Sequence, residues 1–145
     1  MKPMGPIPAG FSEIDGKLAI GGSDCDMLIA QAGDTPLFVY DFAMIRARVA
    51  SLRDALPDGV ALHYAMKANP LPALVTAMAG LVDGLDVASG GEMMVALESG
   101  AKHISFAGPG KRDREIEAAI SAGVTLNVES EGEGRRALDA AARRG

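Results

Sequence analysis

From Thr35 onward, short apolar runs alternate with segments of helical periodicity, and this alternation is typical of parallel βα units. The first run, TPLFVYD, is followed by a helical pattern that stops before Pro57, because proline cannot continue a helix. Four later runs, each followed by a helical pattern, are expected to be strands: ALHYAMK (61–67), GLDVAS (84–89), HISFAG (103–108) and TLNVES (125–130). These runs begin about 21 residues apart, which is a regular spacing for repeated units. The sequence therefore predicts an α/β fold with a parallel sheet.

Four βα units amount to half of a (β/α)8 barrel, although an open doubly wound sheet has the same alternation. Residues 1–34 differ in kind, with a weak strand pattern in FSEIDGKLAIGG and the pattern of a short helix in GSDCDMLIAQAG. We therefore expect a leader segment at 1–34 and a partial barrel domain at 35–145. A half barrel would leave two unpaired sheet edges, so we expect the chain to be the N-terminal part of a longer protein.

The charge balance and the residue content argue against several classes of function. A net charge of -5 without a Lys/Arg cluster larger than a pair disfavours nucleic acid as a partner. The single Cys25 cannot form an internal disulfide, and the lack of a Cys/His cluster predicts that no metal is bound. The prolines of MKPMGPIPAG interrupt any signal peptide or membrane span. These features favour a protein of the reducing cytoplasm.

Side chains alternate across a strand, so the two faces of each expected strand can be compared. One face is large and apolar in the later runs, as Leu85 and Val87 illustrate in GLDVAS. The other face is small or polar, and it carries Asp86 and Ala88 in the same run. A barrel lumen is ordinarily filled by bulky branched side chains. The polar and underfilled lumen predicted here would leave room for a ligand.

Lys67 is the unusual residue of this pattern, since it ends a run that otherwise reads as a buried strand. In one interpretation its side chain extends to solvent or pairs with Asp86 of the neighbouring strand. In the other it is a nucleophile, because desolvation lowers the pKa of a lysine amine and prepares it to form a Schiff base with a carbonyl compound. The periodicity alone leaves both interpretations open.

Five motifs occur in unbroken order: TPLFVYD (35–41), YAMKAN (64–69), LDVASGGE (85–92), ISFAGPGK (104–111) and NVES (127–130). Together they resemble the fold-type III pyridoxal-phosphate decarboxylases, the group of diaminopimelate, ornithine and arginine decarboxylases that shares its barrel with alanine racemase. SGGE and GPGK look most like diaminopimelate decarboxylase, and the leader is similar to that of a bacterial branch associated with the exosortase A system. The resemblance implies the N-terminal half of an alanine racemase-like TIM (β/α)8 barrel, truncated before the rest of the barrel and a C-terminal β domain.

The resemblance also assigns a cofactor and its site. It implies pyridoxal 5'-phosphate (PLP), held by Lys67 as an internal aldimine and approached by the acid Asp86. Ala65 and Ala88 match small residues that line the cofactor pocket, and Glu92 matches an acid among the family's active-site residues. Glu92 has a competing interpretation, because SGGE is also a capping box for the next helix.

The implied activity is decarboxylation of an amino acid, with a racemase of the same fold and a non-catalytic PLP-binding barrel as alternatives. In this family the acid at the pyridine nitrogen, the phosphate loop, and the Cys and Tyr residues of a partner subunit come from later sequence. We therefore expect residues 1–145 alone to be inactive, and the complete protein to be a cytoplasmic homodimer without nucleic-acid or membrane partners. Lys111 of GPGK is expected at the rim of the site, His63 in the core and Asn69 in a strand-exit turn.

Overall fold

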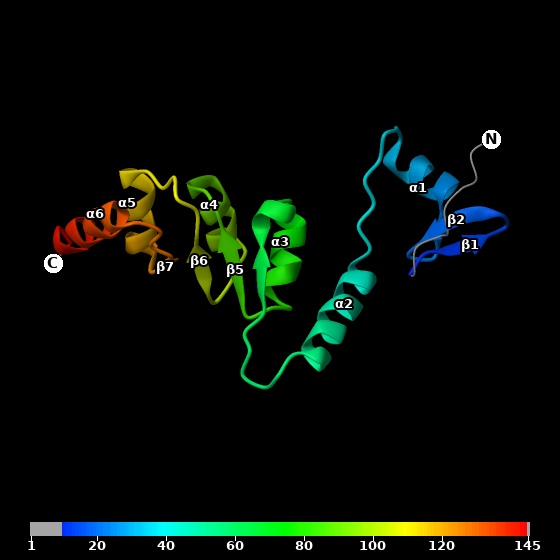
Figure 1. The fold of residues 1–145 in the computed structure, drawn as a ribbon. Coiled ribbons are helices and arrows are strands. Elements are labelled where there is room, and N and C mark those ends of the chain that lie inside the picture. Colours follow the sequence, from blue (N-terminus) through cyan, green and yellow to red (C-terminus); the bar gives the residue numbers. More distant parts are fainter. Residues whose placement is uncertain (1–9, 145) are drawn as a thin grey trace. The chain divides into compact units, whose positions relative to one another are not determined.

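A computed structural model of the chain describes residues 10–144, which belong to two compact units, Met1–Asp54 and Ala55–Gly145 (Figure 1). Apart from Gly10, the N-terminal segment MKPMGPIPAG lies outside the described residues. The boundaries expected at residues 34 and 35 for a leader and a barrel domain stay a prediction. Each unit has a sheet of its own, with three strands in the first and four in the second.

The first unit contains a small antiparallel sheet with the strand order β1-β2-β3. Its elements are β1 (Ser12–Ile14), β2 (Lys17–Ile20), β3 (Ser23–Asp24), α1 (Cys25–Ala32) and α2 (Phe42–Ala55). A two-residue turn joins the first two strands, and its residues Asp15 and Gly16 have the positive φ values, 50° and 76°, that such a hairpin requires. The Asp24 carboxylate accepts the Met27 N–H and caps α1. The weak strands and the short helix predicted before residue 35 are thus confirmed.

The segment TPLFVYD between α1 and α2 does not form the strand that the sequence predicts (Figure 1). A strand needs a neighbour to complete its hydrogen-bond ladder, and within residues 10–144 this segment belongs to neither sheet. Its apolar side chains are therefore exposed, and 83% of Phe38 is open to solvent. The following helix, α2, starts where the Asp41 carboxylate accepts the Ala43 N–H, and it ends before Pro57 as predicted.

The second unit is a parallel sheet in which strands that follow one another in sequence are also neighbours, in the order β4-β5-β6-β7. The strands are β4 (His63–Ala65), β5 (Gly84–Val87), β6 (Ile104–Phe106) and β7 (Thr125–Leu126). The helices are α3 (Pro72–Ala79), α4 (Gly90–Glu98), α5 (Asp113–Ala122) and α6 (Glu131–Ala142), and a short 3-10 helix, η1 (Met66–Ala68), follows β4. The alternation predicted from the sequence is confirmed.

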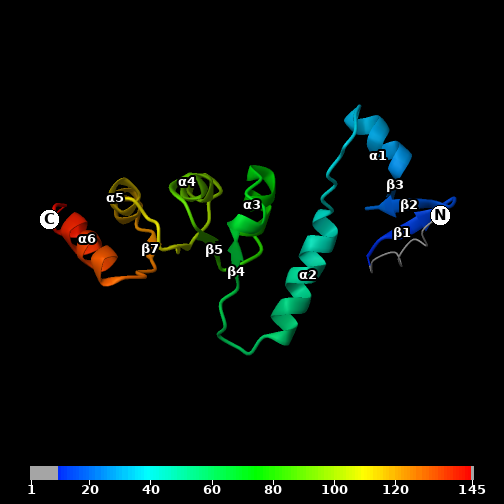
Figure 2. The same ribbon diagram turned by 45° about the horizontal axis from the view of Figure 1, so that its top comes forward.

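Helices α3, α4 and α5 lie along one side of this sheet (Figure 2). The strand residues that face them form the core, and Leu85, Val87 and Phe106 are completely buried. Side chains on the opposite face, including Asp86 and Ser105, are only partly buried. A doubly wound sheet would carry helices on both faces, whereas a barrel wall carries them on one. The second unit therefore has the arrangement of a (β/α)8 barrel wall, and its polar face corresponds to the lumen face.

Gly84, at the amino end of β5, lies close against the His63 side chain. Gly84 pairs with His63 in the sheet, and the imidazole Cε1 of His63 lies 2.6 Å from the position that a Gly84 Cβ would occupy. A side chain at residue 84 would therefore displace this ring or the backbone. His63 itself is exposed and is not the core histidine predicted from the sequence, because it lies on the uncovered face of the sheet.

Candidate functional site

Lys67 lies in η1, just beyond the carboxyl end of β4. The sequence suggested that the strand continues to Lys67, but β4 ends at Ala65 and the chain turns in a single 3-10 turn. Met66 is completely buried, while Lys67 is exposed. Within residues 10–144 the Lys67 amine has neither an ion pair nor a hydrogen-bond partner. The described residues therefore leave the amine open to solvent, at the edge of the sheet where barrel enzymes carry out their chemistry.

The turn that carries Lys67 is held by its own motif. The Tyr64 hydroxyl donates a hydrogen bond to the Asn69 carbonyl at 3.0 Å, which ties the end of η1 back to β4. The Asn69 side-chain oxygen accepts the Leu71 N–H at 3.0 Å and shapes the exit toward α3. Asn69 thus forms the strand-exit turn that the sequence predicts. Tyr64 and Asn69 fix the position of the backbone on both sides of the lysine.

Asp86 lies on the lumen face, in one row with Ala65 and Ser105 across three neighbouring strands. The Ser105 hydroxyl donates a hydrogen bond of 2.8 Å to Asp86 Oδ1, so the serine orients the carboxylate. Asp86 and Lys67 form no ion pair in the structure, so the interpretation of Lys67 as a partner of Asp86 is not supported. The row brings an acid, a hydroxyl and a small side chain together beside the Lys67 turn.

Ala88 lies in the loop between β5 and α4, and Glu92 lies in the first turn of α4. Ser89 Oγ accepts the Glu92 N–H at 3.2 Å, and Glu92 Oε2 accepts the Ala88 N–H at 2.7 Å. The same two hydrogen bonds recur at the start of α6, where Ser130 and Glu133 take the corresponding positions. Helix capping therefore accounts for the backbone contact of Glu92 without a ligand. Its assignment to the cofactor pocket rests on the resemblance.

Lys111 differs most from its predicted place at the rim of the site. Its side chain is buried, with 1% of its surface exposed, and its amine lies 2.8 Å from Glu133 Oε1. Contact with this ammonium lowers the pKa of Glu133 against the effect of burial, which raises it. No motif or periodicity indicates this pairing, because Lys111 follows a Gly-Pro-Gly turn and its partner comes from the next βα unit. The S-x-x-E spacing of Ser130 and Glu133 predicts a helix cap but not the contact with the lysine.

Glu115, in the first turn of α5, also accepts hydrogen bonds from backbone N–H groups. Glu115 accepts N–H groups from Arg112 at 2.9 Å and from Gly90 at 2.8 Å, so it joins two neighbouring βα units. These two backbone hydrogen bonds lower the pKa of Glu115. The loops at the carboxyl end of this sheet are therefore connected to one another through carboxylates.

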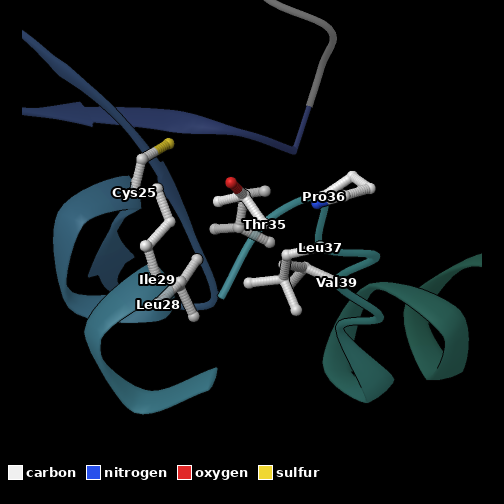
Figure 3. Close-up of a pocket in the computed structure, with 8 residues that line it drawn as sticks. Cys25, Leu28, Ile29, Thr35, Pro36, Leu37 and Val39 are labelled. Carbon is white, nitrogen blue, oxygen red and sulfur yellow. The ribbon is translucent and has the colours of Figure 1, made fainter. Parts of the chain in front are cut away.

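A separate apolar pocket of about 250 Å³ lies in the first unit (Figure 3). It is lined by Ile20, Cys25, Leu28, Ile29, Thr35, Pro36, Leu37 and Val39. The side chains of Leu28, Ile29, Leu37 and Val39 gather around the hollow (Figure 3). Its only reactive group, the Cys25 thiol, donates a hydrogen bond to the Leu18 carbonyl at 3.1 Å. The pocket contains no predicted site residue and offers no acid or base.

Residues 10–144 include neither a metal-binding cluster nor a membrane-spanning helix. They contain no group of three or more His, Cys, Asp or Glu side chains placed to hold a metal ion. Among their helices, none combines the length and the apolar character needed to cross a bilayer.

Comparison with known proteins gives a consistent result. The family model described as "Pyridoxal-dependent decarboxylase, pyridoxal binding domain" matches residues 42–143. Diaminopimelate decarboxylase of Aquifex aeolicus is 40% identical over 119 residues, which are 80% of this chain and 28% of that enzyme. The 2-[(L-alanin-3-ylcarbamoyl)methyl]-2-hydroxybutanedioate decarboxylase of Staphylococcus aureus is 36% identical over 107 residues, which are 72% of this chain and 27% of that enzyme.

A similar solved structure is that of Helicobacter pylori diaminopimelate decarboxylase complexed with L-lysine. It matches with a TM-score of 0.75 and 34% identity, over 83% of this chain and 32% of that one. The chain thus spans about a third or less of the length of the relatives that it matches.

Proposed function

Because this chain belongs to the family of the pyridoxal-binding domain of pyridoxal-dependent decarboxylases, we propose that the complete protein decarboxylates an amino acid, and that Lys67 binds the cofactor covalently. The observation that carries the proposal is the Lys67 amine, which has no partner in the described residues and lies at the carboxyl edge of a one-sided parallel sheet. Diaminopimelate is the first substrate to test, since several relatives are named for it.

The residues beside Lys67 fit such a cofactor. The amine is the group that reacts with the aldehyde of PLP, and no carboxylate holds it in an ion pair within residues 10–144. Ala65, which pairs with Asp86 across the sheet, has the smallest side chain that keeps a Cβ, and Ala88 is exposed just beyond the end of β5. Two alanines at the strand ends leave space for a planar ring beside the lysine. Bulky side chains at residues 65 and 88 would fill it.

When bound, PLP supplies the electron sink that accepts the electron pair left by the departing carboxylate carbon. The contribution of this chain is to bind and to orient. Lys67 provides the covalent attachment, and the Tyr64 and Asn69 contacts hold its turn in place. Asp86, oriented by the Ser105 hydroxyl, places negative charge on the lumen face near the lysine turn. We assign Glu92 to the edge of the pocket, where its second oxygen remains available beside the capping hydrogen bond.

The rest of the site belongs to other parts of the complete protein in this proposal. Residues 35–145 form one portion of the barrel, and residues 1–34 precede it. The acid at the pyridine nitrogen, the phosphate loop and the groups that read the far end of the substrate would come from residues beyond this chain. We propose a homodimer in the cytoplasm, with a small amino acid as the partner of the site.

The test is release of carbon dioxide by the complete protein loaded with PLP. The substrates are the carboxyl-labelled forms of diaminopimelate, ornithine, lysine and the acid cleaved by the S. aureus relative. We expect labelled carbon dioxide from one of the four. Racemisation of an amino acid without release of carbon dioxide would identify a racemase instead. Binding of PLP without either reaction would identify a non-catalytic PLP-binding protein, and both results would contradict the proposed function.

A further inference from the structure

Lys111 and Glu133 form a buried ion pair that the proposed chemistry does not use. They are the two charged residues within residues 10–144 that are buried, with 4% and 3% of their surfaces exposed. The Lys111 amine lies 2.8 Å from Glu133 Oε1 and 5.4 Å from the centre of the Phe106 ring. A lysine is rarely buried in this way, because its charge must be compensated inside the protein.

The Lys111 amine also binds the backbone of two strand-end loops. It donates to the Gly108 carbonyl at 2.7 Å and to the Asn127 carbonyl at 2.9 Å. Gly108 follows β6 and Asn127 follows β7, so one ammonium group joins the carboxyl ends of neighbouring strands. This edge is also the one at which Lys67 follows β4.

Glu133 is also linked to Gly108, through the backbone and the carboxylate of Glu129. Its Oε2 accepts the Glu129 N–H at 2.9 Å, and the Glu129 carboxylate in turn accepts the Gly108 N–H. Glu133 Oε1 is buried and accepts no hydrogen bond, so the nearby ammonium is its compensation. Gly108 is therefore held at both its N–H and its carbonyl by groups that depend on this pair.

Gly108 links the pair to the candidate pocket. Its φ of 104° is in the left-handed region, and the position of an added Cβ would lie 3.7 Å from the Ala88 carbonyl. The loop after β6 thus packs against the loop after β5, which carries Ala88 and leads to Glu92 in the first turn of α4. A shift of Gly108 would change the room beside Ala88.

We propose that Lys111 and Glu133 are a positioning pair, which holds the Gly108 loop in the place that the cofactor pocket requires. The inference rests on the proposed function, since it names PLP as the ligand of that pocket. Lys111 acts through Gly108 and does not touch the cofactor. A pair that served stability alone could be replaced by neutral side chains without effect on PLP binding.

The double variant Lys111→Met/Glu133→Gln distinguishes the two roles in the complete protein. It removes both charges together, so no unpaired charge remains buried, and the glutamine oxygen can still accept the Glu129 N–H. The Gly108 and Asn127 carbonyls lose their donor. We expect a melting temperature near that of the wild type but a dissociation constant for PLP about tenfold higher, measured by titration of the apoprotein.

A matched control is Arg143→Met/Glu117→Gln, which neutralises an exposed ion pair between α5 and the residue that follows α6. This pair touches no strand-end loop, so we expect unchanged PLP affinity. Wild-type affinity in the Lys111→Met/Glu133→Gln variant would overturn the positioning role. A wild-type protein that does not bind PLP at all would instead contradict the proposed function.

A measurement on the wild-type apoprotein tests the pair even if the double variant does not fold. The Gly108 and Glu129 amides are predicted to exchange with deuterium far more slowly than in an unfolded peptide, because both donate to carboxylates of this network. Exchange at the rate of an unfolded peptide would overturn the inference, whether or not PLP binds.

Discussion

Replacing Lys111 by methionine should destabilise the protein strongly, because it leaves the Glu133 carboxylate buried without its cation. Two unit charges 2.8 Å apart attract each other by about 6 kcal/mol at an effective dielectric constant of about 20. The variant no longer bears the free-energy cost of desolvating the lysine, which offsets part of the lost attraction. The expected decrease in the free energy of unfolding is therefore about 3–5 kcal/mol. A domain is typically stable by about 5–15 kcal/mol, so the loss is a large fraction of the total.

Protonation of Glu133 limits this loss. The ordinary pKa of a glutamate is 4.5, and holding the carboxyl protonated at pH 7 costs about 1.4 kcal/mol for each pH unit above that value, or about 3 kcal/mol. The destabilisation by Lys111→Met should therefore be about 3 kcal/mol at pH 7 and should decrease as the pH falls toward 4.5. Adding Glu133→Gln should recover most of the stability and remove this pH dependence.

Urea titration of the complete apoprotein at pH 7.0 and pH 5.0 measures both effects. Arg135→Met is the matched control, because its ion pair with Glu131 lies on α6 with 78% and 90% of the two side chains exposed, and it should cost less than about 0.5 kcal/mol. If Lys111→Met lowers the free energy of unfolding no more than Arg135→Met does, the ion pair of Lys111 and Glu133 is not buried as described. A loss that is the same at both pH values would contradict the role of Glu133.

Three further predictions concern the fold around the site. Phe106→Ala removes a completely buried ring and should cost about 3–5 kcal/mol in urea titration, whereas Leu138→Ala on exposed α6 surface should cost less than about 1 kcal/mol. Gly108→Ala places a side chain at a φ of 104° and should cost about 1–3 kcal/mol, and a neutral result would contradict the backbone geometry. The lowered pKa of Glu115 means that its stabilisation is complete above pH 4.5 and is lost as the pH falls through the folded-state pKa. Glu115→Gln should accordingly flatten acid unfolding curves below pH 4.5, and identical curves would refute its role.

The repeating part of the fold could be predicted because its helix ends and strand faces depend on residues that are close in sequence. The helix pattern after TPLFVYD stops before Pro57 as predicted, and α5 ends at Ala122, where Gly123 with a φ of 70° is the C-terminal cap that glycine commonly provides. The alternation of GLDVAS places Leu85 and Asp86 on opposite faces, and the structure buries the first completely and the second only partly. Such features depend on neighbours in sequence, so the amino-acid sequence by itself is enough to predict them.

Features that depend on distant segments were predicted poorly. TPLFVYD has the composition of a strand but finds no ladder partner within residues 10–144, and β4 stops at Ala65 although the alternating pattern continues to Lys67. The burial of Lys111 could not be predicted, because its compensation comes from Glu133 in the following unit and from two backbone carbonyls. Within the candidate site, the row of Ala65 and Asp86 on one face was predictable, whereas the Ser105 hydrogen bond to that acid depends on the register.

Covalent binding of PLP by Lys67 can be tested by locating the lysine that carries the label. The complete protein is incubated with PLP, reduced with borohydride and digested, and the phosphopyridoxyl peptide is identified by mass spectrometry. Lys102→Ala is the control, since Lys102 is an exposed lysine just before β6, at the opposite end of the strands. We expect a label on Lys67 that persists in Lys102→Ala and disappears in Lys67→Ala. Full labelling of Lys67→Ala at another lysine would contradict this assignment.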